Sequence, residues 1–147
     1  NGGGYGIISA DQVVRQGLKL AQMENKNIKA LKKVFPSTVT VSNPMDLVGD
    51  ATVRRYRLAL EYCMNDENVD IILLIVLYQT PLLSTDIVEI IGEYNDYHKK
   101  PIIVVSTGGH FTEILREALA KNNVVTFTFP EEAVKAIGAL VEYYVKK

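Results

Sequence analysis

The apolar run at residues 69–77 restricts the fold of this chain more than any other segment. Its side chains are nearly all apolar and lack the alternation of apolar and polar residues seen in a strand with one solvated face. Such a strand is buried on both faces, which is typical of a parallel sheet. Residues 101–106 and 124–127 are predicted to be two further buried strands, and residues 18–21 a short one.

Helical patterns alternate with these strands. Helices are predicted at 5–15, at 25–34, from a cap at Asp50 or Thr52 through Met64, from a cap at Ser84 or Thr85 through Tyr94, at 111–121 and from Pro130 to about 145. Alternating strands and helices in one chain of 147 residues indicate a single α/β domain. We therefore expect a three-layer, flavodoxin-like parallel sheet with helices on both faces.

Apolar side chains define the expected inner faces of the first two helices. These are Ile7, Ile8, Ala10, Val13 and Val14 in the first helix, and Ile28, Leu31 and Val34 in the second.

Composition narrows the class of protein. Hydrophobic residues make up 48 % and charged residues 22 %, enough to form a core, and the net charge of −1 gives no basic footprint for nucleic acid. No apolar run reaches the roughly 20 residues that a membrane span needs. We therefore expect neither a nucleic-acid nor a membrane partner. Because Cys63 is the single cysteine and no signal peptide is visible, we expect a cytoplasmic protein.

Three loops are expected at the carboxyl ends of the strands, where α/β proteins bind their ligands. The first is the glycine turn formed by Asn1, Gly2, Gly3 and Gly4 at a helix start, which suits a phosphate or a carboxylate. A tight turn without any ligand explains the glycines equally well. The turn matches neither the Walker loop nor the GxGxxG pattern.

Two loops follow the most buried strands. Gln79 and Thr80 stand after residues 69–77, where Gln79 can bind a polar substrate group. His110 follows Gly108 and Gly109, but no nucleophile or orienting carboxylate accompanies it, so it is expected to cap a helix rather than to act as a base.

The remaining polar positions carry weaker signals. Asp46 lies in a turn-rich loop that leaves its role open, and no cluster of residues shows metal-ligand spacing. A glycine cluster that opens a helix normally follows a strand, which is absent before Asn1. The chain is therefore expected to be a fragment whose sheet lacks its first, central strand.

Five motifs in order resemble one known family. They lie at residues 1–6, 42–52, 68–73, 101–105 and 129–134. Together they resemble the C-terminal flavodoxin-like ligase domain of the α-subunit of ADP-forming acyl-CoA (acetyl-CoA) synthetases, in the succinyl-CoA synthetase superfamily. The resemblance implies that residues 1–147 are one such domain of a larger enzyme.

The resemblance also implies a reaction: acyl-CoA, ADP and phosphate are converted to a carboxylic acid, ATP and CoA through an acyl phosphate and a phosphohistidine. CoA, ATP or ADP and Mg²⁺ are bound mainly by other parts of the enzyme. Those parts are the CoA-binding and phosphohistidine domains of the same polypeptide and an ATP-grasp domain or β-subunit. This chain is expected to carry no catalytic side chain and to be inactive alone.

Site residues are implied in the same way. Asn1, Gly2, Gly3 and Gly4 would supply a helix N-terminus to the phosphoryl group, and Gln79 and Thr80 would border the acyl substrate. The alternative is a non-catalytic regulatory module, similar to the synthetase-like domains that are fused to protein acetyltransferases.

Overall fold

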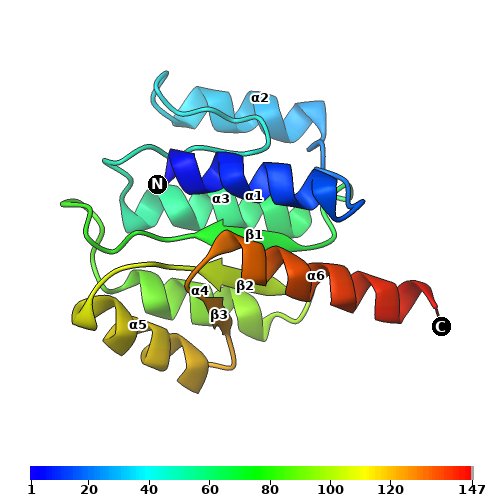
Figure 1. The fold of residues 1–147 in the computed structure, drawn as a ribbon. Helices are drawn as coiled ribbons and strands as arrows, with labels where there is room; N and C mark the ends of the chain where they lie inside the picture. Colours follow the sequence, from blue (N-terminus) through cyan, green and yellow to red (C-terminus); the bar gives the residue numbers. More distant parts are fainter. Residues whose placement is uncertain (147) are drawn as a thin grey trace.

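A three-stranded parallel sheet forms the centre of the molecule. The computed structural model describes residues 1–146. Strands β1 (Ile72–Ile75), β2 (Ile102–Val105) and β3 (Val125–Phe127) lie side by side in that order, all parallel (Figure 1). Ile72 pairs with Ile102, and Ile103 pairs with Val125. The prediction of an α/β fold with a parallel sheet is confirmed.

Within residues 1–146, six helices surround the sheet. They are α1 (Gly3–Arg15), α2 (Asn25–Val34), α3 (Val53–Asn65), α4 (Ile87–Asp96), α5 (His110–Lys121) and α6 (Pro130–Val145). Helices α1 and α6 pack together on one face, while α3, α4 and α5 cover the other, and α2 lies outermost on the β1 side (Figure 1). The predicted three layers are confirmed.

Burial on both faces explains the unbroken apolar strands. All four residues of β2 are buried. Val104 contributes to the larger core under α3, α4 and α5, whereas Ile103 and Val105 contribute to the smaller core with Ala133 and Ile137 of α6. A polar residue at any of these positions would lose its hydration without gaining a partner.

The predicted start signals of α3 and α6 are confirmed. Thr52 caps α3 by accepting a hydrogen bond from the backbone N–H three residues on, and Pro130 is the first residue of α6. The predicted cap of α4 by Ser84 or Thr85 is wrong. Asp86 stands at that position with no side-chain cap, and the Ser84 hydroxyl donates to the Asp86 carboxylate.

The expected inner faces of α1 and α2 are partly wrong. Ile7 is 70 % exposed and Val14 63 %, whereas Gly6 and Ser9 are the buried residues of α1. Small residues allow this helix to lie close to its neighbours, so apolar periodicity alone predicts the wrong face. Val34 of α2 is also exposed, at 57 %.

Residues 18–21 form no strand, contrary to the prediction. A cavity of about 830 Å³ is lined by β1 on one side and by residues 20–23 on another. A strand exists only through hydrogen bonds to a neighbouring strand, and this segment has none to pair with.

No helix within residues 1–146 is both long enough and apolar enough to cross a bilayer.

Candidate functional site

Hydrogen bonds connect the three loops that were predicted to gather at the carboxyl end of the sheet. The side-chain amide of Asn1 donates to Thr80 Oγ1 at 2.8 Å and to the carbonyl of Leu77 at 3.0 Å. Gln79 Nε2 donates to Thr112 Oγ1 in α5 at 3.0 Å. The structure therefore brings the glycine turn next to Thr80, and Gln79 next to the loop that begins α5.

Asn1 fixes the start of the glycine turn against β1. Its Oδ1 accepts from the backbone N–H of Leu77 at 2.9 Å and from the Tyr56 hydroxyl at 2.7 Å. Tyr56 is fully buried, and this burial raises the pKa of its hydroxyl, which stays protonated as a donor. Because the Asn1 side chain is engaged within the fold, the groups of the turn that remain for a ligand belong to the main chain.

The first turn of α1 presents unpaired donors. Within residues 1–146, no acceptor hydrogen-bonds the backbone N–H groups of Gly3, Gly4 or Tyr5. Gly4 is exposed, and a Cβ built on it would meet no atom within 4 Å. A helix N-terminus with free N–H groups carries positive potential and can bind an anion. The open side of this turn lies over Gly4.

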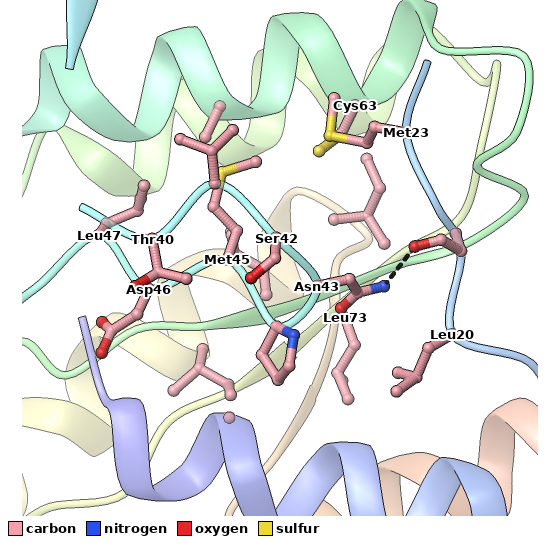
Figure 2. A pocket seen from close by; sticks show the side chains of 18 of the residues that line it. Leu20, Met23, Thr40, Ser42, Asn43, Met45, Asp46, Leu47, Cys63 and Leu73 are labelled. Carbon is pink, nitrogen blue, oxygen red and sulfur yellow. Dashed lines mark hydrogen bonds between the residues drawn. The ribbon is translucent and has the colours of Figure 1, made fainter. Parts of the chain in front are cut away.

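The other sides of the turn are closed. A Cβ on Gly2 would lie 3.0 Å from Leu77 Cδ1, and a Cβ on Gly3 only 2.5 Å from Asp46 Oδ2. Figure 2 shows Asp46 directed from its loop toward the start of α1. Only glycine fits at position 3 without moving Asp46.

The loop that carries Asp46 is held in place by its own backbone. The backbone groups of Asp46 pair with those of Thr40, and Asp46 Oδ1 accepts from the N–H of Val48 at 2.9 Å. Val48 has a φ of 59°, a left-handed conformation that is strained for a β-branched residue. The role of Asp46 is not predictable from the sequence, because nothing in the local pattern indicates that this carboxylate lies against Gly3 at the start of α1.

Other candidate chemistry is sparse. No three His, Cys, Asp or Glu side chains come together as a metal site in the part of the chain that the structure describes. His110 is the first residue of α5 and provides no side-chain cap, so the predicted cap is wrong.

Comparisons with known proteins agree with this architecture. Residues 1–145 match the family model described as "Ligase-CoA domain". The α-subunit of acetate–CoA ligase [ADP-forming] II from Pyrococcus furiosus is 32 % identical over 148 residues, which cover 97 % of this chain and 32 % of the relative. Acetate–CoA ligase [ADP-forming] from Methanocaldococcus jannaschii is 34 % identical over 151 residues, covering 100 % of this chain and 21 % of the relative.

A solved structure of an acetyl-coenzyme A synthetase is also similar to this chain. It is the dinucleotide-forming acetyl-coenzyme A synthetase 1 of Ca. Korarchaeum cryptofilum in complex with phosphate and ADP. Its TM-score is 0.87 at 26 % identity, covering 98 % of this chain and 32 % of that one. The chain thus spans about a fifth to a third of the length of these relatives. The predicted resemblance is confirmed, and the chain belongs to the Ligase-CoA domain family.

Proposed function

We propose that this chain is the ligase domain of an ADP-forming acyl-CoA synthetase, which interconverts acyl-CoA, ADP and phosphate with a carboxylic acid, ATP and CoA. The family match over residues 1–145 supports the assignment, as do relatives named as ADP-forming acetate–CoA ligases. Because the chain spans only part of these relatives, the complete reaction requires CoA-binding, phosphohistidine and ATP-grasp parts in other domains or subunits. We place the enzyme in the cytoplasm.

In this proposal the first turn of α1 stabilises the phosphoryl group during its transfer. The observation that carries it is the set of unpaired N–H groups on Gly3, Gly4 and Tyr5, with Gly4 open to solvent. Donors held in place before the reaction stabilise developing negative charge without having to reorganise. Since the Asp46 carboxylate repels an anion on the Gly3 side, the phosphoryl group approaches over Gly4.

Gln79 and Thr80 have a separate role in the proposal. Gln79 is exposed and its Nε2 is engaged by Thr112, whereas its Oε1 accepts no hydrogen bond from residues 1–146. That oxygen can accept a bond from the acyl substrate at the edge of the turn. Thr80 Oγ1 accepts a hydrogen bond from the Asn1 side chain and so holds the loop after β1 next to the glycine turn.

The nucleotide and its Mg²⁺ are assigned to other parts of the enzyme. Mg²⁺ would supply charge neutralisation for the nucleotide phosphates, but the described residues hold no suitable cluster of ligands for it.

An assay of ligase turnover tests the assignment. The full-length protein, supplied with acetate, CoA, ATP and Mg²⁺, is expected to release ADP over many turnovers only when both acetate and CoA are present, because ATP alone gives at most the one equivalent of ADP that accompanies phosphohistidine formation. Residues 1–147 alone are expected to give no turnover. ADP release by the short chain at the rate of the full-length protein, or none by the full-length protein, would contradict the proposal. The second result would favour the regulatory module.

A further inference from the structure

Strand β3 forms an open edge of the sheet. It pairs with β2 on one side, and within residues 1–146 no strand pairs with its other side, which is the side away from α2 (Figure 1). The stretch 124–129 contains only valine, threonine and phenylalanine, with no charged residue and no proline. Proteins usually protect an exposed edge strand with charges or prolines, because an unprotected edge pairs readily with another strand. We therefore expect another strand to cover this edge.

The backbone groups on the outer side of β3 are available for pairing. Phe127 faces β2, because its carbonyl accepts from the N–H of Ser106 at 3.0 Å. Since alternate residues of a strand direct their backbone groups to opposite sides, those of Thr126 and Thr128 face outward. Within residues 1–146, no backbone group bonds the N–H or the carbonyl of either threonine. The carbonyl of Val124 is also without a partner there, whereas its N–H is bonded at the end of α5.

A second copy of this chain fits this edge in a symmetric antiparallel register. With Thr126 of each copy opposite Thr126 of the other, each Thr126 N–H donates to the other copy's Thr126 carbonyl. Each Thr128 N–H then donates to the Val124 carbonyl of the other copy, and the engaged N–H of Val124 is left undisturbed. The two-fold symmetry of such a pair makes each contact occur twice.

Side chains on the face of α1 and α6 agree with this register. Val125 is 53 % exposed although it is apolar, and Phe127 packs against the smaller core. In the register centred on Thr126, Val125 of one copy lies opposite Phe127 of the other, at a position where cross-strand side chains approach closely. A pair of one β-branched and one aromatic side chain stabilises a sheet at such a position. The pairing therefore covers the exposed side chain of Val125.

Charged residues stand at both ends of the edge. Lys121 ends α5 just before β3, and Glu131 and Glu132 lie in the first turn of α6 just after it. All three are exposed, and none of them forms an ion pair within residues 1–146. Antiparallel pairing brings the beginning of one β3 beside the end of the other, so Lys121 of each copy meets the two glutamates of its partner. Parallel pairing would instead bring like charges together.

We propose that two copies of this chain associate through the outer edges of their β3 strands, with Thr126 at the two-fold axis. The two sheets then form one continuous sheet, in which the strands of the two copies run in opposite directions. The candidate sites of the two copies therefore lie at opposite ends of that sheet and stay open. The partner is a second copy because the edge complements itself in hydrogen bonding, side-chain packing and charge. The inference does not depend on the proposed function, because it concerns only the edge of the sheet.

Cysteine cross-linking in the full-length protein tests the register. Thr126→Cys places a thiol on each copy at positions whose Cα atoms lie about 5.5 Å apart, within the range of a disulfide. After oxidation with copper–phenanthroline, mass spectrometry is expected to find the peptide that contains position 126 joined to a second copy of itself. Val125→Cys is the matched control, because positions 125 of the two copies lie diagonally, roughly 7–8 Å apart, and should cross-link at least about fivefold more slowly.

Charge reversal tests the ends of the edge. Lys121→Glu places acidic side chains against Glu131 and Glu132 of the other copy. The rate of cross-linking through Thr126→Cys at low ionic strength is then expected to fall about tenfold. Adding Glu131→Lys is expected to restore most of the rate. Lys29→Glu makes the same change of net charge at an exposed position of α2 and should leave the rate unchanged.

The results that would overturn the inference are equally defined. If the 126–126 peptide does not form in the folded variant, or if Val125→Cys cross-links as fast as Thr126→Cys, the two edges do not meet in this register. Hydrogen exchange covers the case in which Thr126→Cys does not fold. The N–H groups of Thr126 and Thr128 in the parent protein are expected to exchange about tenfold more slowly than in Lys121→Glu. Equal exchange in the two proteins would contradict the inference, and equal strong protection would assign the edge to another part of the full-length protein.

Discussion

Replacing Gly3 with Ala is expected to destabilise the fold, although alanine is the better helix former. The new Cβ would lie 2.5 Å from Asp46 Oδ2, closer than real contacts allow, so the carboxylate must move. Oδ1 of the same carboxylate accepts from the Val48 N–H at 2.9 Å, so the movement weakens this bond to a charged acceptor, whose full loss would cost about 1.5–3 kcal/mol. Alanine returns roughly 0.5–1 kcal/mol through its helix preference, which leaves a net loss of up to about 2.5 kcal/mol in the free energy of unfolding.

Gly4→Ala is the matched control. The same methyl group one residue later meets no atom within 4 Å, so only the helix preference remains. This variant is expected to gain about 0.5–1 kcal/mol. Urea unfolding of the two variants and of the parent chain measures both changes. For a chain of this size, 1 kcal/mol corresponds to about 2–4 °C in Tm.

A double-mutant cycle isolates the contact. In an Asp46→Ala background the new Cβ at position 3 has room, so Gly3→Ala should become stabilising. The coupling between the two positions is then expected to be about 2 kcal/mol. If the two substitutions add to within roughly 0.5 kcal/mol, or if Gly3→Ala and Gly4→Ala change stability equally, the contact between Asp46 and the turn does not exist as described.

Three further perturbations have defined outcomes. Thr52→Ala should cost about 1 kcal/mol in urea unfolding by removing the cap of α3, whereas Thr52→Ser should cost much less. Burial of Asp66 opposes its ionisation, but three N–H donors outweigh this and lower the pKa of the carboxyl below its ordinary value. The ionised carboxylate therefore stabilises the fold at neutral pH, and this stabilisation is lost as the pH falls through the folded-state pKa. Asp66→Asn should make the stability less dependent on pH in the acid range. Burial lowers the pKa of the Asn1 α-amino group from 8.0 to about 6. Between these pH values the unfolded chain binds more protons than the folded chain, so the stability of the chain beginning at Asn1 should rise from pH 6 to pH 8 by at most about 2–3 kcal/mol. Acetylation of the amine should abolish this rise.

Much of the fold is predictable because its strands are buried on both faces. An unbroken run such as residues 69–77 has few alternatives to a central parallel strand, and Pro130 and Thr52 mark helix starts through local chemistry. The face of α1 is not predictable from apolar periodicity, because Gly6 and Ser9 are chosen for close packing against distant segments. The predicted strand at residues 18–21 is wrong because a strand forms only by pairing with a neighbouring strand, and local sequence does not show whether one is present.

The candidate site is likewise predictable from the sequence only in part. Glycines at a helix start and polar residues after a buried strand predict where the loops gather, because parallel strands share one carboxyl edge. The place of Asp46 depends instead on the pairing with Thr40 and on the left-handed Val48, both products of tertiary structure. The network that joins Asn1, Tyr56 and Leu77 likewise spans 76 residues of sequence.

The proposed role of the first turn of α1 is tested most directly by the rate of phosphohistidine formation in the complete enzyme. Gly4→Asp places a negative charge on the open side of the turn, whereas Gly4→Asn places a neutral side chain of the same shape there. We expect the Asp variant to form phosphohistidine at least tenfold more slowly than the Asn variant, a difference of about 1.4 kcal/mol in transition-state stabilisation. Equal rates in the two variants would show that no anion is stabilised at this turn.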